Sequence, residues 1–314
     1  MTAHDPVDMQ TTETLDPASR VTQVALTVTN LEKSLSFYTT VVGLTIIERN
    51  GSSAVLGAGG SPLLLLYENI STGRWPVLGY TGLYHFAILV PTRAELGRWL
   101  EHWLTLGNPL PGQGDHWVSE ALYISDPDRH GIEIYRDRPT SEWPHVNGRL
   151  QMGADPVDIQ GLLDEAQREA QPWNGLAAET RLGHMHLQVG NLDDARSFYS
   201  GVLGFTVTLD TYRGALFLAA GEYHHHIGVN IWQSRGAGPA PANVASLRWF
   251  TVALPSQSAR DDVVRRIHAA GLDTTEIGNA IAVNDPWNNR IMLLASMDTS
   301  SGDVARLLES TTQN

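Results

Sequence analysis

Short runs of the sequence alternate apolar and polar residues, and helical patterns follow them. Between Val21 and Val28 the alternation has the two-residue period that is typical of a β-strand. Asn30 then stands at a position that favours a helix N-cap, and the helical pattern continues to Val42. It ends at Gly43, a residue that readily adopts the left-handed conformation of a C-cap. This part of the sequence predicts a strand followed by a helix.

The same pattern is repeated later in the chain. The segment VTNLEKSLSFYTTVVGLTI at 28–46 matches VGNLDDARSFYSGVLGFTV at 189–207, which aligns Asn30 with Asn191. A repeat of this length and similarity indicates an internal duplication, so each half of the chain is expected to fold in the same way.

A weaker copy begins within each half, at strands that end in Pro91 and Pro255. Helical patterns follow at Ala94–Leu106 and Ser258–Ala270, and a glycine ends each of them. The chain is therefore predicted to contain four modules of strand, helix and three strands (βαβββ). This makes it an α+β protein in which helices cover the outer faces of curved sheets.

The modules divide the chain into segments. We expect a flexible leader at residues 1–20, a first domain of modules one and two at 21–136, a linker at 137–181, a second domain of modules three and four at 182–296, and a C-terminal tail at 297–314. The leader is polar and acidic with few apolar residues, as flexible segments are. The linker holds four prolines around one short amphipathic piece, Val157–Ala166, and is expected to wrap the surface.

The composition disfavours several classes of protein. No apolar run reaches the roughly 18–20 residues of a membrane-spanning helix, and the first residues lack the hydrophobic segment of a secretion signal. A net charge of −13 disfavours a nucleic-acid role, because neutralising phosphates needs a basic face and the Lys and Arg residues are scattered. We therefore expect a cytoplasmic protein that binds neither a membrane nor nucleic acid. Because the sequence has no cysteine, any metal site must use His, carboxylate and water.

The segment Gly114–Tyr135 places a His, a Tyr and a Glu on strand patterns. Glu133 lies on the face opposite two isoleucines, because side chains on a strand alternate. An earlier run carries Tyr123 and ends at the turn signal Asp126-Pro127-Asp128. The two runs predict a β-hairpin that directs these side chains into one cavity.

This segment resembles the signature of the extradiol ring-cleavage dioxygenases of the vicinal-oxygen-chelate superfamily. The matching residues are Gly114, His116, Leu122, Tyr123, Asp126, Pro127 and Glu133. Arg129 departs from the pattern, because the family prefers Gly or Pro there, and this alters the turn. The phrase Asn-Leu with Phe-Tyr that opens modules one and three is similar to the same superfamily. The resemblance implies two vicinal-oxygen-chelate domains over residues 21–296.

The resemblance also implies where a metal would bind, since ligands in this superfamily come from first strands and a last strand. Those positions hold Gln23, His85, His184 and Trp249 on the first strands, and Glu133 and Met292 on the last strands. Modules two and three together supply His85, Glu133 and His184, the two-His, one-carboxylate set expected for Fe(II), with Mn(II) as the alternative. Pairing within the first half leaves a second choice open, a glyoxalase-type site of Gln23, His85 and Glu133.

Three further residues receive catalytic roles from the resemblance. In the run Glu222–Asn230, read as a strand, His226 lies on one face and His225 on the other. His226 is expected to act as acid and base, with His225 as its nearest rival. Tyr123 would hydrogen-bond a substrate oxygen, and His116 would orient the substrate.

The remaining histidines and aromatic residues receive simpler expectations. His186 is placed on the face of His184. Solvated positions are expected for His4, His102, His130, His145 and His268, and aromatic residues that could line a pocket are Tyr84, Trp117, Tyr223 and Trp232.

The function implied is that of an Fe(II)-dependent extradiol dioxygenase, which cleaves a catechol ring with O2 to a 2-hydroxymuconic semialdehyde-type product. Two alternatives stay open: a glyoxalase-like metal-dependent lyase or isomerase, and a non-catalytic protein that sequesters an aromatic ligand such as a drug. The sequence leaves undecided which catechol is preferred, which divalent first-row ion is bound, and whether the chain forms a homo-oligomer.

Overall fold

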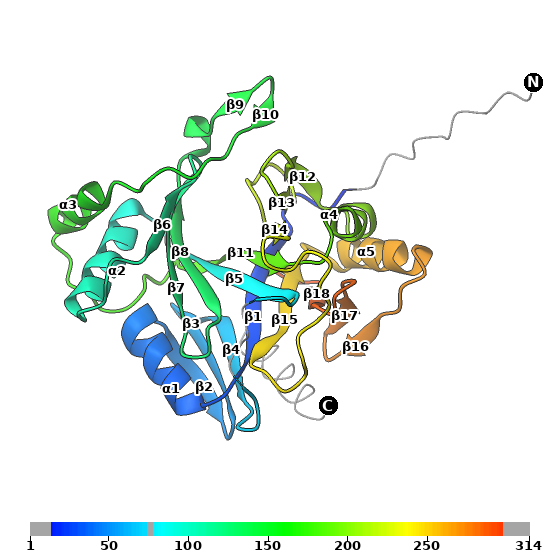
Figure 1. Cartoon of the computed structure of the whole chain (residues 1–314), viewed down its shortest axis with the longest axis horizontal. Coiled ribbons are helices and arrows are strands. Elements are labelled where there is room, and N and C mark those ends of the chain that lie inside the picture. The colour runs from blue at the N-terminus through cyan, green and yellow to red at the C-terminus, as the bar shows by residue number, and fades with distance from the viewer. Residues whose placement is uncertain (1–13, 74–77, 298–314) are drawn as a thin grey trace, which may run out of the picture.

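The computed structural model describes residues 14–73 and 78–297, and its strands form two large curled sheets (Figure 1). Module one comprises β1–β4, module two β5–β8, module three β11–β14 and module four β15–β18. Each module has a helix after its first strand. The predicted α+β fold of four βαβββ modules is thus confirmed.

One sheet combines modules one and four and is called here the outer sheet. Its eight strands have the order β16-β17-β18-β15-β1-β4-β3-β2. Their bounds are β1 Arg20–Val28, β2 Thr45–Asn50, β3 Ser53–Ala58, β4 Ser61–Glu68, β15 Ser246–Ala253, β16 Thr275–Ile277, β17 Ala280–Asn284 and β18 Arg290–Leu294.

The other sheet combines modules two and three and is called the inner sheet. Its order is β12-β13-β14-β11-β5-β8-β7-β6. Their bounds are β5 Gly82–Leu89, β6 Gly112–Asp115, β7 Ser119–Ser125, β8 Gly131–Asp137, β11 Arg181–Gln188, β12 Thr206–Leu209, β13 Ala215–Ala219 and β14 Ile227–Asn230.

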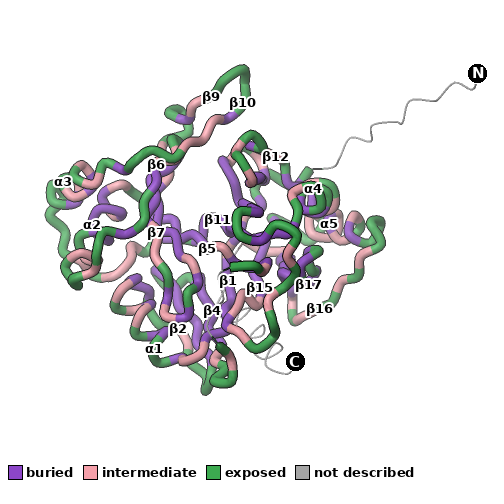
Figure 2. The backbone as a smooth tube through the Cα atoms, in the orientation of Figure 1, coloured by how far each residue is buried: buried purple, intermediate pink, exposed green. Residues whose placement is uncertain are grey.

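The sheets do not follow the two halves of the sequence. First strands pair antiparallel across the halves, β1 with β15 and β5 with β11. The domains expected at residues 21–136 and 182–296 follow the repeat in the sequence, whereas each sheet takes half of its strands from either range. Apolar residues of both sheets form one core, and the central strands are largely buried (Figure 2).

The helices begin and end close to the predicted positions. Their bounds are α1 Leu31–Ser36, α2 Arg93–Thr105, α3 Ile159–Glu169, α4 Leu192–Ala195 and α5 Gln257–Ala269. The Asn30 side chain accepts from the backbone N–H of Lys33, and Gly43 has a φ of 92°, as a left-handed C-cap requires. Among the described residues, no helix is both long and apolar enough to cross a bilayer.

Each of the repeated helices continues into a π-helical turn that the sequence did not predict, Phe37–Val42 in module one and Arg196–Val202 in module three. The tyrosine of each repeated phrase lies in this turn. Tyr38 donates to Asp126 at 2.9 Å, and Tyr199 donates to Asp285 at 2.8 Å. These buried bonds tie the first helix of each half to the Asp-Pro turn of the module that follows it.

The two Asp-Pro turns differ at their fifth residue. His130 donates to Asp126 at 2.9 Å and is buried, so the expectation that it is solvated was wrong. Asn289 occupies the equivalent position and donates to Asp285 at 2.8 Å. Burial raises the pKa of the Asp285 carboxyl, while at Asp126 the nearby His130 outweighs burial and lowers its pKa.

The described end of the leader packs on the protein, and the linker holds more secondary structure than the one amphipathic piece predicted. Residues 1–13 of the leader, with His4, and residues 298–314 of the tail lie outside the described residues. Leu15 is 3% exposed and its N–H donates to the carbonyl of Gly204, so this part of the predicted flexible leader packs on the protein. In the linker, α3 packs on α2 at Gly97, where a Cβ would lie 2.2 Å from the Leu162 carbonyl oxygen. A 3-10 turn (Thr140–Glu142) and the hairpin of β9 (His145–Val146) and β10 (Arg149–Leu150) complete the linker.

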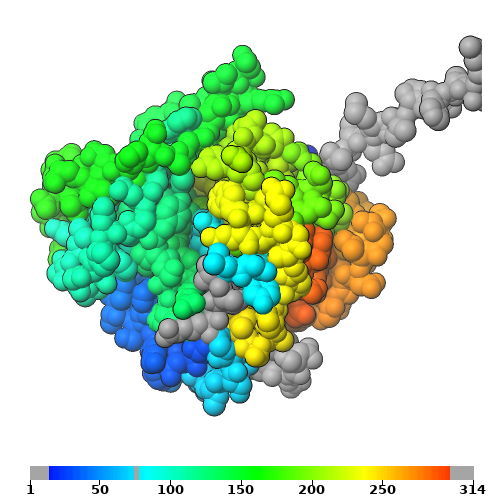
Figure 3. All heavy atoms as spheres, viewed as in Figure 1, coloured from blue at the N-terminus to red at the C-terminus, as the bar shows by residue number. Residues whose placement is uncertain are grey.

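A segment between modules one and two also joins the halves. The N–H of Gly79 donates to the carbonyl of Gln233, and that of Thr81 donates to the carbonyl of Gly238. In Figure 3 this segment, in cyan, lies against the yellow surface of the second half. The cross-half pairing therefore extends beyond the sheets.

The difference between the two turns predicts opposite responses to acid. The lowered pKa of Asp126 contributes stability that is complete above the unfolded-state pKa of about 3.9 and is lost as pH falls through the folded-state pKa. Asp126→Asn should therefore cost about 1.5–3 kcal/mol at pH 7, and the cost should shrink towards pH 3. Urea unfolding of the native protein and of Asp126→Asn between pH 7 and pH 3 measures this difference in the free energy of unfolding.

The matched control is Asp285→Asn. Since the folded-state pKa of Asp285 is raised, its ionisation opposes folding at neutral pH, and the cost of its substitution should not shrink on acidification. The same acid response for both variants would contradict this explanation.

Candidate metal centre

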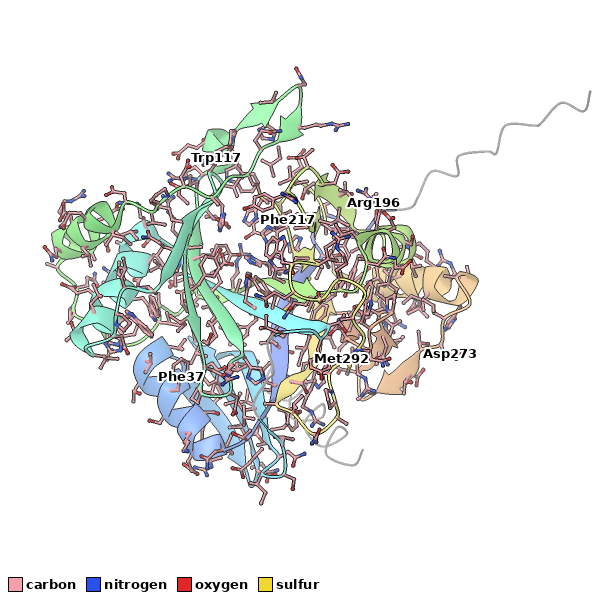
Figure 4. All side chains as sticks on the ribbon, in the orientation of Figure 1. Phe37, Trp117, Arg196, Phe217, Asp273 and Met292 are labelled. Carbon is pink, nitrogen blue, oxygen red and sulfur yellow. The ribbon has the colours of Figure 1, made fainter. Side chains whose placement is uncertain are left out.

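A cavity of about 610 Å³ lies on the concave side of the inner sheet. Strands β5 and β11 form its floor, β7 and β8 line one side, and β13 with neighbouring loops lines the other, so both halves of the chain contribute (Figure 1). Its aromatic lining includes Tyr84, Phe217 and Trp232. Phe217, labelled in Figure 4, comes from the β13 wall. A cavity of this size and character fits a small aromatic ligand.

The three predicted metal ligands meet in this cavity. Nε2 of His85 lies 2.9 Å from Oε2 of Glu133, and Nε2 of His184 lies 3.1 Å from the same oxygen. All three residues are buried, and one ligand atom from each lies within 4.8 Å of the others. Two imidazoles and a carboxylate that converge in this way fit a divalent ion such as Fe(II) or Mn(II).

The register of the inner sheet explains why the ligands meet. His184 on β11 pairs with Ala87 on β5, and Ala87 pairs in turn with Glu133 on β8. The methyl group of Ala87 leaves space for the larger side chains on either side of it. His85 lies two residues from Ala87 and therefore on the same face.

Charge at the three ligands suits a cation. Burial alone would raise the pKa of Glu133, but His184 and His85 hold it well below its usual value. Burial also lowers the pKa of His184, against the opposing effect of Glu133. An ionised carboxylate and a neutral imidazole are the forms that bind metal. The pKa shifts of Glu133 and His184 therefore favour the forms that bind a cation.

Among the residues that the structure describes, the equivalent face of the outer sheet holds no such set. Trp249 and Met292 occupy the positions of His85 and Glu133, and they pack in an apolar cluster with Ala25 and Leu65. Gln23, the equivalent of His184, is buried on β1 of this outer sheet and does not line the cavity. The geometry thus favours the cross-half ligand set over the Gln23, His85 and Glu133 alternative.

Tyr123 and His116 also lie in the cavity, as predicted. Tyr123 pairs with Glu133 across the hairpin. Nδ1 of His116 donates to the Gly153 carbonyl at 2.7 Å, so in neutral His116 the other nitrogen accepts from the Tyr123 hydroxyl at 2.6 Å. Burial and the Glu133 charge raise the pKa of Tyr123, which keeps this hydroxyl protonated.

The structure corrects the placement of His226. The run Glu222–Asn230 becomes a strand only at Ile227, because Gly221 turns the chain with a φ of 62° before it. Strand alternation therefore does not apply to the three histidines. His225 lines the cavity, with its ring centroid 4.1 Å from that of His184, whereas His226 lines a separate cavity.

Several contributors to the site were missed or misplaced. The linker supplies Met152 and Gly153 to the lining, and no sequence pattern indicated this. Among the aromatic candidates, Tyr84 and Trp232 line the cavity, while Trp117 and Tyr223 do not. His186 lies in the lining beside His85, with ring centroids 4.9 Å apart.

Arg129 also lines the cavity, at the position where the signature prefers Gly or Pro. It has a φ of 74°, so the turn keeps a left-handed residue although its side chain is large.

Comparison with known proteins identifies the family of this chain. The sequence model of the Glyoxalase/Bleomycin resistance protein/Dioxygenase superfamily matches residues 20–134 and 181–293. The chain belongs to this superfamily. A relative, the catechol-2,3-dioxygenase of Bacillus subtilis (strain 168), is 46% identical over 269 residues, which cover 83% of this chain and 92% of the relative.

Two solved structures share the fold. A putative dioxygenase from Bacillus subtilis subsp. subtilis str. 168 has a TM-score of 0.63 at 14% identity, covering 92% of this chain and 87% of that one. Glyoxalase I from Zea mays has a TM-score of 0.56 at 15% identity, covering 95% of this chain and 98% of that one. At these identities the likeness concerns the fold alone.

The cross-half set predicts different effects at equivalent strand positions. His184→Ala should weaken metal binding more than about 100-fold, because it removes a direct ligand and not only a supporting contact. Gln23→Ala, its equivalent in module one, should bind metal as the native chain does. Titration of the metal-free proteins with Fe(II) or Mn(II) under anaerobic conditions measures both affinities. Equal losses in the two variants would contradict the cross-half site.

Proposed function

We propose that this protein is an Fe(II)-dependent extradiol dioxygenase that cleaves a catechol with O2 to a 2-hydroxymuconic semialdehyde-type product. The observation that carries the proposal is the convergence of His85, Glu133 and His184 in an aromatic-lined cavity. The relative that is 46% identical and is named a catechol-2,3-dioxygenase supports the same activity. Iron, when bound, would bring catechol and O2 together and carry electrons between them.

The cavity wall provides binding and orientation for an aromatic diol. Tyr84 and Trp232 form an edge-to-face pair, with ring centroids 5.4 Å apart. Such faces pack against a planar ring and exclude water from it. The diol oxygens would then lie towards the carboxylate and the imidazoles at the floor.

Tyr123 and His116 act as a positioned pair beside that floor. The Tyr123 hydroxyl hydrogen-bonds to Nε2 of His116 at 2.6 Å, and its oxygen can also accept from a substrate hydroxyl. The Gly153 carbonyl fixes the His116 ring from the other side. The pair thereby orients one substrate oxygen without changing charge.

His225 takes the acid and base role that the sequence assigned to His226. It lines the cavity next to His184, whereas His226 lines another. Burial lowers the pKa of His225 well below its usual value, so its ring is neutral and one nitrogen lacks a proton, which is the form from which a general base starts.

Oxygen consumption tests the proposal against its alternatives. After anaerobic loading with Fe(II), addition of catechol under air should consume one O2 per catechol and form a yellow ring-cleavage product. A lyase or isomerase reaction needs no O2, and a sequestering protein would bind catechol unchanged. Iron-loaded protein that binds catechol without O2 uptake would contradict the dioxygenase proposal.

The two neighbouring histidines form a matched pair of variants. His225→Ala should keep its iron and lose about 10²–10⁴-fold in kcat, the usual contribution of a general acid or base. His226→Ala should keep both iron and turnover. Steady-state oxygen uptake measures kcat, and parallel analysis measures the iron content. A larger loss of kcat in His226→Ala than in His225→Ala would assign the acid and base role to His226.

A further inference from the structure

Three side chains form a hydrogen-bonded line that leads away from the cavity. Nδ1 of His225 lies 2.8 Å from Nδ1 of His224, and Nε2 of His224 lies 2.8 Å from Oδ1 of Asp137. The His224 side chain is completely buried, and that of Asp137 is 22% exposed. Neither His224 nor Asp137 lines the cavity.

The Asp137 carboxylate is itself held in place. Its Oδ2 accepts from the Tyr223 hydroxyl at 3.0 Å, and the Tyr135 hydroxyl lies 2.8 Å from that of Tyr223. Since Tyr223 gives its proton to the carboxylate, Tyr135 donates to Tyr223. The indole of Trp143, from the linker, contacts the His224 ring with centroids 5.3 Å apart. The line is therefore fixed by groups from both halves and from the linker.

The chemistry of these atoms determines where the protons lie. A carboxylate accepts only, so His224 donates from Nε2. With one proton on each ring, Nδ1 of His224 is then an acceptor, and Nδ1 of His225 must carry a proton to bond with it. That leaves Nε2 of His225 without a proton. Among the described residues, none hydrogen-bonds this nitrogen, and His225 lines the cavity.

We propose that Asp137 and His224 are positioning residues that set the tautomer of His225, so that the unprotonated Nε2 is the nitrogen left for the diol. This rests on the proposed function for its catalytic consequence. In the proton transfer proposed there for His225, the substrate O–H bond breaks, its electron pair stays on oxygen, and the proton bonds to Nε2. The imidazolium keeps its Nδ1–H on His224, and Asp137 stabilises the charge through that ring. An aspartate in the Ser-His-Asp triad fixes a histidine tautomer in the same way.

The test exchanges the carboxylate for an amide of the same shape. In Asp137→Asn the amide N–H₂ can donate to Nε2 of His224, which moves the His224 proton to Nδ1 and reverses the tautomer of His225. We expect kcat to fall about 10²–10⁴-fold with unchanged iron content and KM. Asp137→Glu, which keeps the acceptor, should recover most of kcat. Asp155→Asn, a change at a carboxylate outside the line, should match the native enzyme.

Nitrogen NMR of metal-free protein labelled at histidine reads the tautomer independently of activity, with His225→Ala assigning the signals. The native spectrum should show His225 protonated at Nδ1 only, and Asp137→Asn should reverse this. A native His225 protonated at Nε2, or a cationic His224, overturns the inference even if no variant folds. Unchanged kcat in folded Asp137→Asn overturns it as well. The expected tautomers in a protein without dioxygenase activity would instead refute the proposed function.

Discussion

The antiparallel pairing of β5 with β11 is the interaction on which the site depends. It joins the second module of one half to the first module of the other and places His184, Ala87 and Glu133 in one row across three strands. A shift of this register by one residue would turn His184 to the opposite face of the sheet, since side chains alternate. The pairing therefore fixes the ligand set as well as the fold.

The duplicated halves make this arrangement available twice, yet only the inner sheet carries ligand chemistry among the described residues. In the outer sheet an indole and a thioether replace an imidazole and a carboxylate, and they fill the equivalent space with apolar contacts. A buried ionised group needs partners, whereas Trp249 and Met292 pack without them. One duplicated framework thus supports a core on one side and a polar centre on the other.

Much of the fold and of the site followed from the sequence, because alternation and repetition are local signals. The repeat aligned Gln23 with His184 and His85 with Trp249, which was enough to favour two inner modules over two successive ones. The positions of residues in loops could not be predicted from these patterns. A turn at Gly221 moved His225 into the cavity in place of His226. The contribution of Met152, the burial of His130 and the packing of Leu15 depend on distant partners that no periodicity encodes.

The proposed site places one metal ion between the two inner modules. Anomalous diffraction from crystals of the Fe(II)- or Mn(II)-loaded protein, recorded on both sides of the metal absorption edge, would locate that ion. We expect one strong peak per chain, about 2.0–2.3 Å from Nε2 of His85, Nε2 of His184 and a carboxylate oxygen of Glu133. A peak beside Gln23, or one that lacks any of these three ligands, would contradict it.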